Sequence, residues 1–291
     1  MSPKDFSDFT VNAPYLTIKE LADKYQVSEE TAKELKDKSV GELNFPESTC
    51  EIYDQYARIR SSRTLIIGDI ECPEYNAQTL EMALAISKKF SLDTMIINGD
   101  LIALDSFSTW VRSIVYKLTF KDELKSSLKV LETFSKYFRR IFINCGNHER
   151  RLAKALGGEL SIGDFFNNLP GVEYSEYSYS YLESGNRKPI LVAHQDNYSR
   201  NPLTVARTLA SIEQCCVICG HTHFLSQGFD ISGKNWIVDG GSARDPQRTF
   251  YKVSRKNLYP AWNLGFCFVI DGVPFLVNKD NFPFYMNGVI S

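Results

Sequence analysis

No run of apolar residues in this sequence approaches the roughly 18 that a membrane-spanning helix needs. The first residues, MSPKDFSDFTVNAPYL, have no apolar segment behind a basic start, so they do not resemble a secretory signal. Histidine is also scarce, with four in 291 residues. We therefore expect a protein that has no membrane partner, and the positions of the few histidines become informative.

Regular cysteine spacing and a basic charge balance are missing as well. The seven cysteines are an odd number without the spacing of a disulfide framework, which predicts reduced thiols and a cytoplasmic location. Cys216 and Cys219 have the spacing of a redox pair, but they lie in an apolar run that favours buried structural thiols. The net charge of −2 provides no overall field that would attract nucleic acid, so only a local patch could do so.

The first part of the chain, residues 1–45, reads as a small helical segment, and residues 46–291 read as the main body. Thr17 and Glu20 form a capping-box pattern at the start of one helix, and Ser28 can cap a second. Together the two helices predict a helix-turn-helix. Residues 44–46, Asn-Phe-Pro, predict a linker into the body.

A helix-turn-helix can read DNA, but the charge of this one argues against that role. Residues 1–40 contain six Lys and eight Asp or Glu, and the second helix, SEETAKELK, has no Arg, Asn or Gln to contact bases. A role in packing or oligomerisation is therefore favoured over DNA binding.

From Arg63 onward, short apolar runs alternate with segments whose pattern is typical of helices, as in an α/β protein. Runs separated by helices predict parallel strands covered on both faces, and the later runs, with few helices between them, predict a second sheet. We expect an α/β fold in which two mixed β-sheets pack as a sandwich flanked by helices. The predicted strands are TLIIGD, TMIINGD, IFINCGNH, ILVAH, CCVICGH and segments near 225–231, 235–239 and 265–277.

Five of these apolar runs lead directly into polar residues that can bind metals. The segments are GDIE, NGD, CGNHE, AHQD and CGHTH, and they contain all four histidines of the chain. Ligands bind at the carboxyl ends of strands in open α/β sheets, so these segments can meet at one point. Carboxylate oxygens and imidazole nitrogens together suit Mn, Fe or Zn better than Ca.

The order of these motifs resembles the calcineurin-like metallophosphoesterase superfamily over about residues 63–245. The text NHERRL, the helical insert before GNHE and the tail YPAWNLGF are similar to phage-type or bacterial members. The resemblance implies two divalent cations, with Mn²⁺ expected and Fe, Zn, Mg and Ni as alternatives. A bridging water of lowered pKa would then attack the phosphate.

The resemblance also implies a role for each motif residue. Asp69 and His223 would bind the first metal, and Asp100 would bridge the two. Asn147, His194 and His221 would bind the second metal. His148 would contact the phosphate and protonate the leaving oxygen as general acid.

Two positions depart from the family pattern. The first family motif is Asp-x-His, whereas this chain has Glu71 in place of the histidine, so Glu71 is either a ligand or a neighbour of the ligands. The family often has an acid three residues after the second GD, where it supports the catalytic histidine. This chain has Ala103 there, and Asp105 is the nearest acid to take that role.

Arginines near the motifs are candidates for contact with phosphate groups, above all Arg150 and Arg151, which follow His148 directly. The others are Arg139, Arg140, Arg244 and Arg248.

The sequence thus predicts a dinuclear phosphoester hydrolase, with a phosphodiesterase or nuclease favoured. Its substrate would be a phosphoester, with nucleic acid or a nucleotide among the candidates. A phosphomonoesterase, either a protein Ser/Thr phosphatase or a small-molecule phosphatase, uses the same metal chemistry and stays open. A non-catalytic binding module is the third alternative, and it rests on Glu71 and Ala103.

Overall fold

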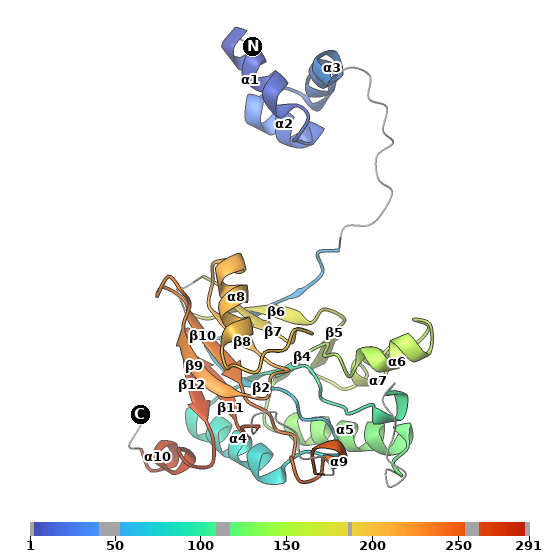
Figure 1. Ribbon diagram of the computed structural model, residues 1–291, viewed down its shortest axis with the longest axis vertical. Helices are drawn as coiled ribbons and strands as arrows, with labels where there is room; N and C mark the ends of the chain where they lie inside the picture. The colour runs from blue at the N-terminus through green and yellow to red at the C-terminus, as the bar shows by residue number, and fades with distance from the viewer. Residues whose placement is uncertain (1–2, 41–52, 109–116, 186–187, 254–261, 289–291) are drawn as a thin grey trace. The chain divides into compact units, whose positions relative to one another are not determined.

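The computed structural model describes residues 3–40, 53–108, 117–185, 188–253 and 262–288 (Figure 1). The chain divides into two compact units, residues 1–54 and 55–291. The predicted linker at residues 44–46 and the boundary beside it lie outside the described residues, so they stay predictions.

Over residues 3–40, the N-terminal unit has three helices rather than the predicted two. They are α1 (Pro3–Asn12), α2 (Ile18–Tyr25) and α3 (Glu29–Val40). The capping box at Thr17 is confirmed, because the Glu20 carboxylate accepts from the Thr17 N–H and the Thr17 hydroxyl accepts from the Glu20 N–H. A small apolar core formed by Phe9, Leu21 and Ala32 holds the three helices together.

The second unit is built from two six-stranded mixed sheets, which confirms the predicted architecture. Sheet A has the order β1 (Ala57–Arg60), β6 (Tyr179–Glu183), β7 (Ile190–Ala193), β8 (Val217–Cys219), β10 (Trp236–Gly240), β9 (Leu225–Phe229). Sheet B has the order β12 (Val273–Val277), β11 (Phe266–Ile270), β2 (Arg63–Ile67), β3 (Thr94–Asn98), β4 (Arg140–Asn144), β5 (Val172–Ser175).

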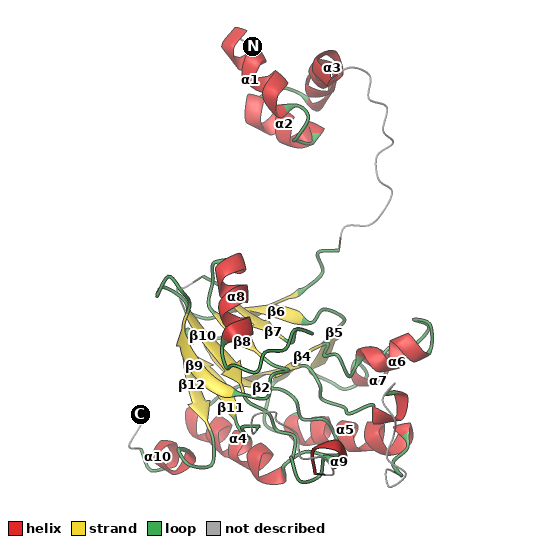
Figure 2. Cartoon of the chain, viewed as in Figure 1, coloured by secondary structure: helices red, strands yellow, loops and turns green. Residues whose placement is uncertain are grey.

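The sheets pack face to face, and helices cover their outer faces (Figure 2). The alternation of side chains along β2 shows why: Ile66 lies between the sheets, whereas Leu65 and Ile67 pack under α4 (Ala77–Phe90) and α5 (Phe120–Phe134). On the other side, α8 (Thr204–Glu213) covers sheet A. The remaining helices are η1 (Asp105–Phe107), α6 (Arg150–Ala155), α7 (Gly163–Phe166), α9 (Phe250–Val253) and α10 (Phe282–Met286).

Strands β1, β5 and β6 and helix α8 were not expected from the sequence. β1 and β5 lie at sheet edges, where exposed polar residues such as Arg58 and Glu173 interrupt the apolar signal. The helical insert before GNHE contains α5, which ends at Phe134, and the predicted strand IFINCGNH corresponds to β4, which begins one residue earlier, at Arg140. Among the described residues, no helix has the length and apolar character needed to cross a bilayer.

Candidate metal centre

The predicted ligands lie at the carboxyl ends of strands from both sheets. Strands β2, β3 and β4 of sheet B lead into the segments with Asp69, Asp100 and Asn147, and β7 and β8 of sheet A lead into His194 and His221. Backbone hydrogen bonds fix these segments to one another, since the Glu71 N–H donates to the Asp100 carbonyl at 2.8 Å. The structure therefore brings together residues that are up to 154 positions apart in the chain.

Asp69, Glu71 and His223 form one candidate cation set. Their ligand atoms lie within 4.8 Å of one another, and all three side chains are buried. His223 Nε2 is 3.0 Å from Asp69 Oδ1 and 3.6 Å from Glu71 Oε1, yet Asp69 Oδ1 has no hydrogen-bond partner. Asp69, Glu71 and His223 thus direct lone pairs toward one point, where a cation could accept them. Their oxygen and nitrogen donors fit Mn²⁺, Fe or Zn.

Asp100, His194 and His221 form a second set, with Asn147 beside it. His194 Nε2 lies 3.2 Å from both Asp100 Oδ2 and Asn147 Oδ1. The other ring nitrogen, Nδ1, lies 2.8 Å from the Asn98 carbonyl. Because a carbonyl can only accept, Nδ1 carries a proton, which leaves Nε2 as the atom that can bind a metal.

A third set, formed by Glu71, Asp100 and His148, joins the first two. His148 Nδ1 lies 3.4 Å from Glu71 Oε2, and His148 Nε2 lies 3.7 Å from Asp100 Oδ2. The backbone N–H of His148 also donates to Asp100 Oδ1 at 2.9 Å. All four histidines of the chain thus belong to one connected group of side chains.

The backbone at these segments adopts a conformation that non-glycine residues rarely take. The φ angles are +49° at Asp69 and at Glu71, +51° at Asp100, +68° at His221 and +59° at His223. Each such residue costs on the order of 1–3 kcal/mol, a cost that folded proteins accept mainly at functional sites. The strain supports a functional origin for the geometry.

Two glycines allow the close approach of these segments. A Cβ on Gly99, whose φ is +75°, would lie 2.4 Å from His194 Cγ. A Cβ on Gly146 would lie 2.1 Å from Asp100 Oδ1. Any larger residue at either position would displace a candidate ligand.

The electrostatics of the group are dominated by burial and by the Asp100–His194 pair. Burial opposes ionisation of Asp100, but the charge and hydrogen bond of His194 and the hydrogen bond from the His148 backbone N–H outweigh it, so the pKa of Asp100 lies well below the ordinary value. Burial also disfavours the charged form of His194, yet Asp100 raises its pKa to about 10. A cation would take the place of the proton that this pair holds, so metal binding should release protons.

At three neighbouring groups, Glu71, His148 and His221, burial outweighs the nearby charges and favours the neutral form. It raises the pKa of Glu71 well above its ordinary value, although the Arg244 charge opposes the shift. It lowers the pKa of His148 well below its ordinary value, and it lowers the pKa of His221. In the protein without cations, His148 is therefore neutral near pH 7.

Glu149, the last residue of the GNHE motif, has a role that the sequence did not reveal. Its buried carboxylate accepts four backbone N–H groups, from Asp100, Leu101, Ile102 and Gly146, at 2.8–3.3 Å. Burial raises its pKa to about 7 despite these donors. Glu149 thereby ties the segment after β3 to the segment after β4.

Arg244 was expected to face phosphate, but its side chain is 2% exposed. It donates to Glu71 Oε2, and its Nε and Nη2 donate to Glu74 Oε2 at 3.0 and 2.6 Å. No local sequence signal could have paired residues 170 positions apart. Arg140 begins β4 and Arg139 precedes it, roughly 13 Å from the strand end that carries the ligands, so neither lies beside the candidate metal centre.

Arg151 and Asp105 lie next to His148 in a chain of contacts. Arg151 Nη2 is 2.8 Å from His148 Nε2, and Arg151 Nη1 donates to Asp105 Oδ1 at 2.7 Å and to the Ala103 carbonyl at 2.8 Å. Asp105 thus reaches His148 through Arg151. Arg150 donates to Asp196, an exposed residue two positions after His194.

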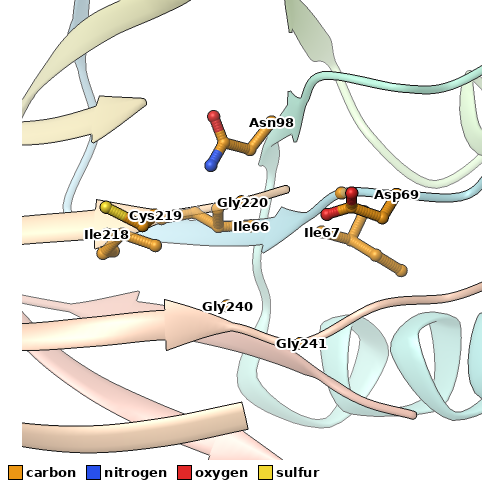
Figure 3. A pocket seen from close by; sticks show the side chains of 10 residues that line it. Ile66, Ile67, Asp69, Asn98, Ile218, Cys219, Gly220, Gly240 and Gly241 are labelled. Carbon is orange, nitrogen blue, oxygen red and sulfur yellow. The ribbon is translucent and has the colours of Figure 1, made fainter. Parts of the chain in front are cut away.

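A small hollow lies behind the ligands, between the ends of β2, β3, β8 and β10 (Figure 3). Isoleucines, glycine backbones and Cys219 line it, with Asp69 and Asn98 at its edge. Of the two predicted buried thiols, Cys219 is buried and Cys216 only partly so, and burial raises the pKa of Cys219 well above its ordinary value. The hollow lies where the ends of strands from both sheets come close together.

Comparison with solved structures finds similar chains of low sequence identity. YfcE, a phosphoesterase from E. coli, is 13% identical, with 75% of this chain and 94% of that chain covered and a TM-score of 0.41. Vacuolar protein sorting 29 from Cryptosporidium parvum is 15% identical, with coverage of 74% and 95% and a TM-score of 0.40. Vps29 from Entamoeba histolytica complexed with Zn²⁺ is 13% identical, with coverage of 75% and 93% and a TM-score of 0.39. No curated protein matches the chain in sequence.

A family model gives the assignment directly. The model described as calcineurin-like phosphoesterase matches residues 62–225, more than half of the chain. The matched range runs from β2 to the start of β9 and includes each of the seven predicted ligands. The chain belongs to the calcineurin-like phosphoesterase family.

Proposed function

We propose that this protein is a dinuclear metal-dependent phosphoester hydrolase, and that its substrates are phosphodiesters, with nucleic acid or nucleotides as the leading class. One observation carries the proposal. Two candidate cation sets lie side by side at the strand ends, and Glu71 and Asp100 join them through a third. Asp100 is then the bridging carboxylate, and Asn147 completes the second set.

Mn²⁺ is the proposed native cation, with Fe, Zn, Mg and Ni as alternatives. When bound, the cations supply a nucleophilic water of lowered pKa and neutralise charge on the phosphate oxygens. The protein supplies the ligand geometry and the backbone that holds it, including the Glu149 bonds to the segment after β3.

His148 is the proposed general acid. In the free protein, Arg151 donates to His148 Nε2, because a guanidinium cannot accept, so this nitrogen carries no proton. A phosphate placed beside them would give Arg151 an oxygen to bind, and its negative charge would favour the imidazolium. His148 Nε2 could then donate its proton to the leaving oxygen.

The two arginines at the start of α6 support a diester substrate. Arg151 is partly exposed beside His148, and Arg150 lies next to it with a more exposed side chain. Such groups can contact the phosphates that flank the cleaved bond of a polymer. Asp105 would hold Arg151 in place, and it has no direct part in the proton transfer.

A substrate screen with added Mn²⁺ tests the proposal. It would compare bis-p-nitrophenyl phosphate, p-nitrophenyl phosphate, and single- and double-stranded DNA and RNA, with Asp100→Asn as the inactive control. Turnover of diesters is expected. Turnover of the monoester alone would favour a phosphatase, and no turnover with bound metal would favour a binding module.

A further inference from the structure

The backbone of Arg244 is fixed to the segment that carries the first cation set. The Ala243 N–H lies 3.3 Å from the Gly68 carbonyl and 3.2 Å from the Asp69 carbonyl. The Asn76 N–H donates to the Ala243 carbonyl at 2.7 Å, and the Asp245 N–H donates to the Glu74 carbonyl at 2.8 Å. These bonds hold the arginine against the stretch from Gly68 to Asn76.

The Arg244 guanidinium is a buried positive charge with carboxylates around it. It bonds Glu71 and Glu74, and Asp105 Oδ2 lies 3.8 Å from Nη2. The Trp262 ring lies 5.7 Å from the guanidinium carbon. A charge removed from water in this way requires paired opposite charge, and Glu71 and Glu74 provide it.

Glu71 therefore serves two neighbours with its two oxygens. Its Oε1 faces His223 Nε2 at 3.6 Å, within the first cation set, and its Oε2 accepts from Arg244. A carboxylate that already compensates a guanidinium attracts a second cation less strongly. The guanidinium also repels a cation directly, and this repulsion is strong where water is excluded.

We propose that Arg244 sets the metal affinity of the first cation position, formed by Asp69, Glu71 and His223, and keeps it weaker than the second. The second position is formed by Asp100, Asn147, His194 and His221. Neither of the carboxylates that bond Arg244 in the structure, Glu71 and Glu74, is among these ligands. The inference rests on the proposed cation pair. It adds that the two positions fill in order, the second before the first.

The order of filling has a functional consequence. Where the free cation concentration lies between the two dissociation constants, most molecules hold a single ion. The fraction with both ions then follows the cation concentration, so the protein responds to metal supply. Arg244 is the positioning residue that sets this range, and it does not touch the substrate.

Equilibrium dialysis of the full chain against Mn²⁺ alone, followed by metal analysis, tests the proposal. The wild-type protein should bind two ions with dissociation constants that differ at least tenfold. His223→Ala should remove the weaker event, which assigns it to the first position. Arg244→Gln should tighten the weaker event at least tenfold and change the tighter one by less than twofold.

Glu74→Gln provides the opposite test and leaves the arginine in place if Arg244→Gln fails to fold. It removes the Glu74 charge from the guanidinium, so Arg244 keeps Glu71 as its hydrogen-bonded carboxylate, with Asp105 at 3.8 Å, and draws more strongly on Glu71. The weaker event should therefore weaken severalfold. Arg248→Gln is the matched control, because Arg248 is exposed and pairs with Asp245, and it should change neither constant.

Equal constants in the wild type, or an unchanged weaker constant in Glu74→Gln, would overturn the proposal. Because the readout is binding, the result does not depend on turnover. A chain that shifts its metal affinity as described but hydrolyses no phosphoester would contradict the proposed function and leave the role of Arg244 standing.

Discussion

At the scale of single residues, the proposed function gives His148 the most specific chemical role, that of the general acid. We expect His148→Asn to lower kcat by roughly 100-fold or more, the size of effect that a lost general acid produces. The variant should keep its bound metal, because both predicted ligand sets stay intact. Steady-state kinetics and metal analysis on the same sample check this. Loss of one ion would instead make His148 a ligand, as the set with Glu71 and Asp100 allows.

A second residue, Asp239, makes the stability of the fold depend on pH, although it is not one of the candidate ligands. Asp239 in β10 is 1% exposed; its Oδ2 accepts from the Leu203 N–H at 2.6 Å, while Oδ1 has no hydrogen-bond partner. Burial raises its pKa to about 6 from the ordinary 3.8. The native state therefore holds this proton more tightly than the unfolded state, and stability is lost as pH rises from about 4 through 6.

Asp239→Asn removes that loss. We expect it to stabilise the protein at pH 7.5 by roughly 1–3 kcal/mol, with the difference vanishing near pH 4. Urea unfolding at both pH values measures it. Asp280→Asn, a change of the same kind at an exposed position, should have little effect at either. A destabilised Asp239→Asn at pH 7.5 would contradict the argument.

At the scale of elements, the site depends on loops held by side chains rather than on the strands alone. The Glu149 carboxylate joins the loop after β3 to the loop after β4 through four N–H groups. In Glu149→Gln, an amide NH₂ replaces one accepting oxygen, so two buried donors lose their partner. We expect a loss of about 2–4 kcal/mol.

Urea unfolding and metal analysis of Glu149→Gln check this, with the exposed Glu159→Gln as control. The metal content of Glu149→Gln should fall, because the loop that carries Asp100 is no longer held. Unchanged stability would mean that the loops keep their geometry without this side chain.

At the scale of the whole molecule, bound cations should stabilise the fold, because the ligands come from both sheets and meet only in the native state. A cation at 100 times its dissociation constant adds about 2.7 kcal/mol per site. For a unit of this size we expect Mn²⁺ to raise Tm by roughly 5–10 °C for each site that it fills. Calorimetry with Mn²⁺ and then with EDTA measures the shift, and an unchanged Tm would argue against a metal centre.

Because the chain forms two compact units, we expect metal binding to be retained when the N-terminal unit is removed. Since residues 55–291 contain every candidate ligand and both sheets, a chain reduced to them should fold and keep the metal affinity of the full protein. Circular dichroism and Mn²⁺ dialysis test it. A large fall in metal affinity would show that the N-terminal unit contributes to the centre.

Most of the candidate ligands could be predicted from the sequence, because the motif that contains each of them follows an apolar strand. The end of a strand can be recognised from local sequence. The segments from GDIE to CGHTH therefore predicted Asp69, Asp100 and His221 as candidate ligands without any knowledge of tertiary contacts. The edge strands β1 and β5 lacked this signal, because half-exposed strands contain polar residues that resemble loops.

The sequence by itself determined the family, the two-sheet architecture and the residue types that a cation could bind, since these depend on short-range pattern and motif order. Only the tertiary structure decided that Arg244 is buried against Glu71 and Glu74, that Asp105 reaches His148 through Arg151, and that Glu149 holds the loop of Asp100. The physical reason is that ion pairs and buried hydrogen bonds join residues distant in the chain. Their partners are fixed by how the two sheets bring their strand ends together.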